Sequence, residues 1–392
     1  MAPLPKIGIA CFGSYGGSGV VATELGRALA KRGYEVHFLS NQLPFRLLST
    51  EAPENIYYHE VETVYYDALP HRSYGLELAS RILRVAEEHS LNVLHAHYAV
   101  PHAISALLAK LILLPRELHV VTTLHGTDIT LVGVSPSYYE LTRWAIEHSD
   151  AVTCVSKWLR DRTLQEFKIT RPPLVVYNFV DMARFKKTRS DRLFRSYFAD
   201  EDEKIILHVS NFRPVKRIPD AIRAFALVLK KLPARLLLLG DGPERDACAQ
   251  LVHELGISRY TLFLGKQHPI EKFYSIADLL MMPSEYESFG MAALEASAAG
   301  VPVICTGGSG LAEVVVDGIT GFLCEVGNAE MLAARAIEVL SNPQLARQMG
   351  NAARRRAATC FNLNKIISQY ERIYHALLAG QELPSDPQDC TG

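Results

Sequence analysis

The sequence predicts an α/β protein built from two doubly wound domains that face each other across a cleft. Short apolar runs alternate with helical stretches over residues 1–180, and the same alternation restarts over residues 204–362. Strands that alternate with helices are typical of a parallel sheet covered by helices on both faces. A length of 392 residues also exceeds one ordinary domain. Because ligands of such sheets bind outside the carboxyl ends of the strands, we expect the binding site in the shared cleft.

The first domain is predicted to begin with Lys6–Phe12, an apolar run suited to a strand buried on both faces. The glycine-rich turn Gly13–Gly19 follows, and it leads into a helix that ends at Arg32, before Gly33. Further strands are predicted at 35–40, 56–61, 93–97, 120–124, 151–155 and 174–177. Further helices are predicted at 74–89, 101–113, 136–148 and 156–167.

A polar, charge-rich linker with a short helix at 190–198 separates the domains. In the second domain, strands are predicted at 205–209, 235–239, 261–264, 279–282 and 301–305, and helices at 218–231, 243–255, 270–276, 288–299, 328–341 and 343–358. We expect a last helix at 363–378 to pack back on the first domain, and the final twelve residues to be disordered.

The composition restricts the class of protein. A hydrophobic content of 48% with 21% charged residues is typical of a soluble globular protein, and a net charge of −1 gives no electrostatic footprint for nucleic acid. The seven cysteines are scattered, which favours reduced thiols in a cytoplasmic protein. No signal peptide is apparent, and the longest apolar stretch, 103–114, is too short to span a membrane.

The stretch from Ser284 to Gly300 places two carboxylates near a predicted strand-to-helix turn. Glu287 lies at that turn, and Glu295 follows eight residues later, so a helix from residue 288 would present both on roughly one side. Backbone N–H groups at a helix start suit oxygen-rich or anionic ligands. A sugar-phosphate site is therefore one hypothesis, and a solvated acidic helix start is the other.

Two loops could hold phosphate groups. In the second domain, Arg213, Lys216 and Arg217 follow the first strand, and an Arg fork beside a Lys charge suits a diphosphate, although a solvated basic turn has the same pattern. In the first domain, Gly17–Ala22 fits the dinucleotide pattern G-x-G-x-x-A. The second strand ends at Asn41 without a carboxylate for a ribose, which disfavours NAD but leaves phosphate binding at the helix start.

Histidines follow two strands of the first domain. His125 ends a strand at the cleft side, where it could donate a hydrogen bond to a sugar, act as an acid or base, or be structural. His95 and His97 share a strand face and His102 lies nearby, but the sequence offers them no carboxylate partner, so we expect no metal there. The D-x-D pattern at Asp200 lies in the charged linker and is more typical of a solvated loop.

The motifs resemble those of the retaining glycosyltransferases of family 4, which have the GT-B fold of two Rossmann-like domains. Glu287 and Glu295 match the E-x7-E signature, and Gly240–Glu244 is also typical of that family. Over residues 6–378 the chain resembles the branch that transfers N-acetylglucosamine from UDP-GlcNAc to L-malate in bacillithiol biosynthesis. The segments that carry this resemblance are Gly16–Glu24, Pro44–Arg46, His95–His102, Thr122–Thr130, Tyr177–Asp181 and Val209–Arg213.

The resemblance implies roles for individual residues. Catalytic positions are His125, Glu287, Arg213 and Lys216, with His125 near the reacting carbon and Glu287 on the transferred sugar. Donor-binding positions are Gly16, Gly17, Arg213, Lys216, Lys266, Gln267, Glu287, Phe289, Gly290 and Glu295. Acceptor-binding positions are Ser18, Tyr98, Thr127 and Arg143, the last as the cation for a dicarboxylate.

The resemblance implies transfer with retention of configuration, with no metal and no cofactor. The chain departs from most of the family at Asn211, where an Arg is usual, and at Ser309, where Gly-Gly is usual before Glu313. An alternative is a family 4 enzyme with another NDP-sugar and a polyol, phosphate or lipid acceptor. A sugar-nucleotide-binding protein without activity, or a dehydrogenase, would be alternatives outside the class. The sequence leaves open whether the chain forms a homo-oligomer.

Overall fold

The computed structural model describes residues 4–13, 16–48, 53–62, 74–185 and 191–386. They form two compact units. Unit 1 holds the described residues up to Asn178 together with those from Asn364 onward, and unit 2 holds those from Phe179 to Leu363. The short helix α7 (Asp191–Ser196) belongs to unit 2, where Arg195 Nη2 donates to Asp278 Oδ2 at 2.8 Å.

Unit 1 is organised around a seven-stranded parallel sheet in the order β3-β2-β1-β4-β5-β6-β7. The strands are β1 (Ile7–Ala10), β2 (Val36–Ser40), β3 (Ile56–Glu60), β4 (Val93–His97), β5 (His119–Leu124), β6 (Ala151–Cys154) and β7 (Leu174–Val175). The predicted strands are confirmed, with β7 shorter than expected. Strand β1 is fully buried because both neighbours and both helical layers cover it.

The helices of unit 1 also follow the predicted positions. They are α1 (Gly17–Lys31), α2 (Tyr74–His89), α3 (Ile104–Leu113), α4 (Thr127–Thr130), α5 (Tyr139–His148) and α6 (Lys157–Phe167). A short irregular helical segment, η2 (Ala99–Ala103), precedes α3, because Val100 has an extended backbone conformation inside the stretch predicted as one helix. The single turn α4 was not predicted.

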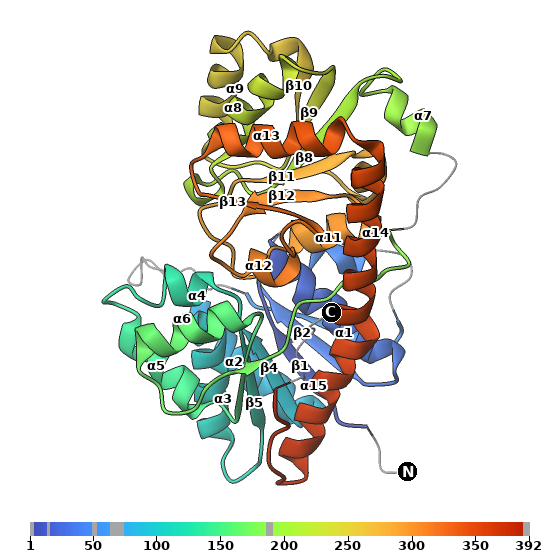
Figure 1. The fold of residues 1–392 in the computed structure, drawn as a ribbon. Coiled ribbons are helices and arrows are strands. Elements are labelled where there is room, and N and C mark those ends of the chain that lie inside the picture. Colours follow the sequence, from blue (N-terminus) through green and yellow to red (C-terminus); the bar gives the residue numbers. More distant parts are fainter. Residues whose placement is uncertain (1–3, 14–15, 49–52, 63–73, 186–190, 387–392) are drawn as a thin grey trace. The chain divides into compact units, whose positions relative to one another are not determined.

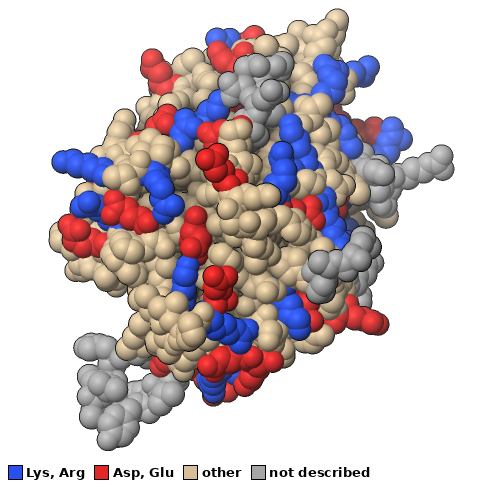
Figure 2. Space-filling view, turned by 90° about the horizontal axis from the view of Figure 1, so that it is seen from below, with Lys and Arg blue, Asp and Glu red and all other residues tan. Residues whose placement is uncertain are grey.

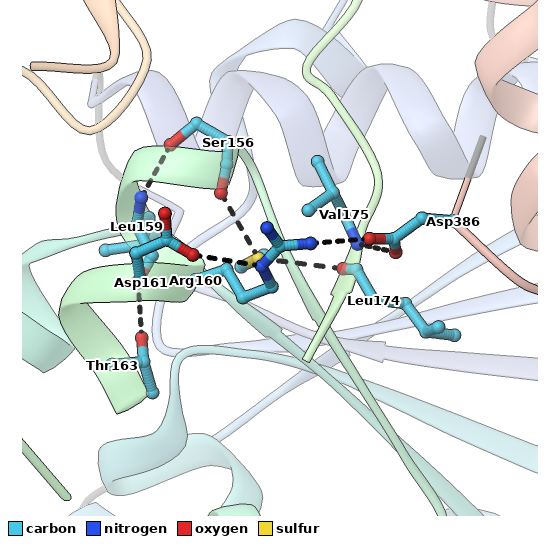
Figure 3. A network of polar contacts seen from close by, with 9 residues as sticks. Ser156, Leu159, Arg160, Asp161, Thr163, Leu174, Val175 and Asp386 are labelled. Atoms are coloured by element: carbon cyan, nitrogen blue, oxygen red, sulfur yellow. Dashed lines mark hydrogen bonds and ion pairs between the residues drawn. The ribbon is translucent and has the colours of Figure 1, made fainter. Parts of the chain in front are cut away.

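The last long helix, α15 (Leu363–Leu378), packs on unit 1 alongside α1, as Figure 1 shows. Tyr374 and His95 Nδ1 share a buried hydrogen bond of 2.7 Å. Beyond the helix, Asp386 accepts hydrogen bonds from Val175 N at 2.8 Å and from Arg160 Nη1 at 2.6 Å (Figure 3). The expectation that the last twelve residues are disordered is therefore wrong for residues 381–386, and residues 387–392 lie outside the described part.

Unit 2 contains a six-stranded parallel sheet in the order β10-β9-β8-β11-β12-β13. The strands are β8 (Lys204–Val209), β9 (Ala234–Leu239), β10 (Thr261–Gly265), β11 (Leu279–Met282), β12 (Val303–Thr306) and β13 (Gly321–Cys324). The edge strand β13 was not predicted. Buried aliphatic side chains of β8, β9 and β11 form one core with helices α8 (Ile218–Leu229) and α13 (Ala329–Leu340).

The remaining helices of unit 2 are α9 (Arg245–Glu254), α10 (Glu271–Ile276), α11 (Met291–Ala299), α12 (Leu311–Val314) and α14 (Pro343–Cys360). The prediction that a helix begins at residue 288 is wrong, since α11 begins at Met291. Gly290 precedes it with a φ of 97°, and a Cβ there would lie 2.4 Å from Leu311 Cδ2. A turn that needs a glycine in this conformation therefore delays the helix.

The described surface matches the nearly neutral net charge. On the face drawn in Figure 2, basic and acidic side chains are interspersed. Within the described ranges, no helix has both the length and the apolar composition that a membrane span requires.

Candidate active site

In unit 2 several of the predicted donor residues lie where the strand order reverses. Strands β8 and β11 are neighbours in the sheet but not in the sequence, so the loops that follow them leave a shared carboxyl-terminal edge in opposite directions. Such a switch point is where doubly wound sheets bind ligands. The loop after β8 carries Lys216, and the loop after β11 carries Glu287.

Lys216 and Glu287 form an ion pair, with Nζ 2.6 Å from Oε1. Their side chains are only 18% and 13% exposed, so the pair is shielded from bulk water on most sides. Ser284 donates a second hydrogen bond to the same Oε1 at 2.9 Å. Two donors on one oxygen fix the carboxylate and leave Oε2 as the freer acceptor. Ser284 was not predicted as a site residue. Its position at a strand end, three residues before Glu287, could have identified it.

Backbone contacts hold these loops together. Glu285 N donates to Val215 O at 2.8 Å, which joins the loop after β11 to the loop after β8. Gly310 N donates to Glu287 O at 2.9 Å from the loop after β12. A Cβ at Gly310 would lie 2.2 Å from Ser288 O, so only glycine permits this approach. The neighbouring Ser309 is buried.

Glu287 and Glu295 occupy different surroundings. Glu287 lies in the turn before Gly290, outside the helix, whereas Glu295 lies inside α11 and accepts a hydrogen bond from Tyr274 at 2.9 Å. The predicted place of Glu287, at the turn between a strand and a helix, is confirmed. The Phe289 ring is buried against Phe361 at 5.4 Å, so only its backbone remains for a ligand.

Three further predicted donor residues of unit 2, Arg213, Lys266 and Gln267, are exposed. Arg213 immediately precedes the short helical turn Pro214–Lys216, at the same switch point as Glu287. Lys266 and Gln267 follow β10, which lies two strands away from β8 at the sheet edge.

In unit 1 the switch point lies between β1 and β4. Gly16 and Gly17 begin α1 after β1, and the N–H groups of its first turn have no partner within the helix. The hydroxyl groups of Ser18 and Tyr98 are hydrogen-bonded at 2.9 Å, which joins the first turn of α1 to the loop after β4. The Tyr98 ring lies 5.3 Å from the His125 ring, between centroids. Three predicted residues are therefore brought together at one sheet edge.

His125 ends a row of stacked histidines. Its Nε2 lies 2.9 Å from His97 Nδ1, and the His97 ring stacks on His95 at 4.4 Å. His95 Nε2 is hydrogen-bonded to Thr123 at 2.6 Å. Burial lowers the pKa of His125 and of His95 to about 3, so both rings are neutral near pH 7. A neutral His125 donates a hydrogen bond from one ring nitrogen and accepts one at the other, and it carries no charge.

Asp128 was also missed by the sequence reasoning. It is buried and accepts backbone hydrogen bonds from Ala99 at 3.1 Å, Gly126 at 2.9 Å and His125 at 3.2 Å. Burial raises its pKa to about 6, although these donors oppose the shift. Asp128 therefore positions the loop that carries His125 and the loop after β4 relative to each other. Asp128 is a charged residue shortly after a predicted buried strand, and this position could have identified it as a candidate.

The two remaining predicted acceptor-binding residues, Thr127 and Arg143, lie on different helices. Thr127 is the first residue of α4, directly after the His125 turn. Arg143 lies on α5, is 41% exposed, and pairs with Glu147 one turn later at 3.7 Å. The direct contacts that join Ser18, Tyr98 and His125 do not include it.

Comparison with known proteins decides the family. The model "Glycosyltransferase Family 4" matches residues 15–184, and the model "Glycosyl transferases group 1" matches residues 189–356. The chain is also 47% identical over 373 residues to the N-acetyl-alpha-D-glucosaminyl L-malate synthase of Bacillus anthracis, covering 95% of this chain and 97% of that protein. The chain belongs to glycosyltransferase family 4.

Solved glycosyltransferases share the fold. The structure of a glycosyltransferase from Rickettsia africae aligns with a TM-score of 0.80 at 22% identity, covering 95% of this chain and 98% of that one. The HepE protein of Anabaena, solved with UDP and glucose, aligns with a TM-score of 0.79 at 21% identity, covering 94% and 98%. The family 4 enzyme described here therefore has the GT-B architecture of two Rossmann-like units.

Proposed function

We propose that this family 4 glycosyltransferase transfers N-acetylglucosamine from UDP-GlcNAc to the hydroxyl group of L-malate, with retention of configuration, as the first step of bacillithiol biosynthesis. The Lys216–Glu287 pair at the switch point of unit 2 carries the proposal of sugar-nucleotide chemistry. The 47% identity to the Bacillus anthracis synthase supports the choice of substrates.

On the donor side, Arg213 and Lys216 bind the diphosphate, and Glu287 binds hydroxyl groups of the transferred sugar. Lys216 contacts Glu287 directly, so one cation can stabilise both the carboxylate and a neighbouring phosphate. The N–H groups before α11 contact the sugar, and Glu295 binds the ribose. The backbone near Lys266 and Gln267 binds the uracil, and the Gly16–Gly17 amides add donors for the diphosphate.

On the acceptor side, Ser18, Tyr98 and Thr127 bind malate together with Arg143, which supplies the charge that a dicarboxylate needs. Three of these side chains are hydroxyl groups, which can donate to a carboxylate or accept from a hydroxyl group. The Arg143 side chain is partly exposed and has only a long ion pair of 3.7 Å to Glu147, which leaves its charge available for a carboxylate of malate.

The chemistry proceeds without a covalent enzyme intermediate. The departing β-phosphate takes the proton of the malate hydroxyl group on the face from which the acceptor attacks, so the configuration is kept. The protein contributes positioning and charge stabilisation. Cationic side chains and backbone amides take the place of a metal at the diphosphate, and transfer therefore needs no divalent ion.

The deciding experiment is UDP release from UDP-GlcNAc with L-malate, compared with D-malate, glycerol phosphate and inositol phosphate. We expect fast release with L-malate alone, and full activity in EDTA. Release with a phosphorylated polyol but not with malate would favour the alternative, a family 4 enzyme with a different acceptor. We place the enzyme in the cytoplasm, since its seven cysteines are scattered along the sequence, as in proteins of reducing compartments.

A further inference from the structure

Three histidines of unit 1 gather beside β2 and β3, apart from the residues of the candidate active site. They are His37 on β2, His59 on β3 and His89 at the end of α2. After α2, Asn92 N donates to Lys6 O, so the end of this helix lies beside the start of β1. His37 is the second residue of β2 and His59 is the fourth of the five residues of β3, so the cluster lies beside these two strands. Tyr98 and His125 follow the carboxyl ends of β4 and β5.

The side chains converge on one point. Nitrogens of the three rings all lie within 4.8 Å of one another, and His37 Nδ1 lies 2.9 Å from His59 Nε2. The His89 ring lies 4.5 Å from the His37 ring and 5.3 Å from the His59 ring, between centroids. Two nitrogens on one tetrahedral zinc ion lie about 3.3 Å apart, since each Zn–N bond is about 2.0–2.1 Å. The nitrogens of His37 and His59 are near this spacing. A rotation of the half-buried His89 side chain would bring its nitrogen to a similar distance from both.

The outer nitrogen of His37 has the partner that metal-binding histidines usually have. Its Nε2 lies 3.0 Å from Glu35 Oε1, and Lys6 pairs with the same carboxylate oxygen at 2.8 Å. A carboxylate on the second ring nitrogen fixes the tautomer and leaves the lone pair of Nδ1 pointing to the metal position. This arrangement directs His37 Nδ1 at the other two histidines.

The charges and the exposure of the cluster also bear on metal binding. Arg81 and Lys6 are the nearby cations, and Glu35 neutralises Lys6 through their ion pair. His37 is buried, whereas His59 and His89 are partly exposed, which gives an ion a route from solvent.

We propose that His37, His59 and His89 bind one transition-metal ion of the Zn²⁺ class, with water in the fourth position. Imidazole donors suit Zn²⁺ and, in decreasing availability, Cu²⁺ and Ni²⁺, rather than Mg²⁺ or Ca²⁺. The ion cross-links β2, β3 and the end of α2, and thereby stabilises unit 1. It takes no part in sugar transfer, because Tyr98 and His125 of the candidate active site follow β4 and β5, whereas the three ligands belong to β2, β3 and α2.

The test uses the untagged full-length protein, stripped with EDTA and freed of chelator by gel filtration. Zn²⁺ is titrated in competition with a chromophoric chelator, and Co²⁺ is added separately to record its visible absorption. We expect one Zn²⁺ per chain, an intense tetrahedral Co²⁺ band, and a rise in Tm on adding Zn²⁺.

The variants separate this site from other histidines. His59→Ala and His89→Ala change partly exposed side chains, and each should weaken Zn²⁺ binding more than tenfold and abolish the rise in Tm. Glu35→Gln should weaken binding about 10–100-fold. The control His148→Ala removes an exposed histidine of α5, whose ring bonds Trp144 O, and should bind Zn²⁺ like the wild type. Binding that is unchanged in both His59→Ala and His89→Ala, or absent at micromolar Zn²⁺, would overturn the proposal.

Discussion

His97 Nδ1 lies 2.9 Å from Nε2 of His125, and this contact sets the tautomers of both rings. Among the described residues, the buried His97 Nε2 has no hydrogen-bond partner. A proton on that nitrogen would leave a buried N–H group unsatisfied, which costs more than an unpaired acceptor. We therefore infer that His97 donates from Nδ1 to His125 Nε2. His125 then carries its own proton on Nδ1, as a donor for a sugar oxygen.

This tautomer predicts graded effects on catalysis. His125→Ala removes the donor and should lower kcat by about 10²-fold or more, the scale for one positioned donor. His97→Phe keeps a ring but removes the hydrogen bond to His125 Nε2, so the tautomer of His125 is no longer fixed. We therefore expect a smaller loss of kcat, with KM for UDP-GlcNAc nearly unchanged. Steady-state kinetics of both variants, with His148→Ala as the control, make the comparison. Wild-type kcat in His97→Phe would contradict the assigned tautomers.

Lys216 is predicted to stabilise the leaving diphosphate. Lys216→Ala should lower kcat by about 10²–10³-fold, because it removes one main charge-stabilising donor. It also leaves the largely buried Glu287 without its cation. Arg217→Ala is a matched control, since Arg217 follows in the same loop but pairs with Asp220 at 2.6 Å. If Lys216→Ala stays nearly as active as the wild type, the diphosphate assignment is wrong.

Glu287 is predicted to orient the sugar rather than to attack it. Glu287→Gln should reduce activity without stopping it, since the amide keeps the shape and one acceptor. Intact-mass measurement of the wild-type enzyme quenched during turnover should show no added N-acetylhexosamine. A covalent sugar adduct that disappears in Glu287→Gln would establish a nucleophilic role instead.

Gly310 is predicted to be required for the loop that holds Glu287. Gly310→Ala would place a methyl group 2.2 Å from Ser288 O, so the loop must shift, at a cost of about 1–3 kcal/mol. We expect a lower Tm together with a lower kcat. Gly307→Ala is the matched control, because its Cβ would meet only Leu323 Cβ at an ordinary 3.7 Å. Equal effects of the two variants on kcat would refute this explanation.

Unit 1 is predicted to lose stability as the pH falls below 6.5. Burial lowers the pKa of His95 and of His102 from 6.5 to about 3, so the unfolded chain binds more protons than the folded one between these values. Stability is therefore complete above about pH 6.5 and falls toward pH 3, by up to about 1.4 kcal/mol per pH unit for each histidine. Urea unfolding in EDTA at pH 7.5, 6 and 5 measures the slope. His95→Gln should make it shallower, and an unchanged slope would contradict the prediction.

Much of the fold could be predicted because its signals are local. Continuous apolar runs such as Leu279–Met282 match the observed strands residue for residue. The start of α11 was misplaced because the alanine-rich stretch favours a helix and gives no sharp start, whereas burial of the Phe289 ring and the left-handed Gly290 turn delay the helix to Met291. Local propensity is a weak guide where packing decides the backbone.

The sequence by itself determined the alternation of strands and helices, the two parallel sheets, and the loops that carry Lys216, Glu287 and His125. Only the tertiary structure decided which side chains touch. Lys216 and Glu287 are 71 residues apart, and His97 and His125 are 28 apart. Their contacts depend on the strand order that makes β8 neighbour β11 and β4 neighbour β5. The spacing of apolar residues in the sequence indicates whether a side chain faces a core. It does not indicate which residue of a distant strand that side chain will contact.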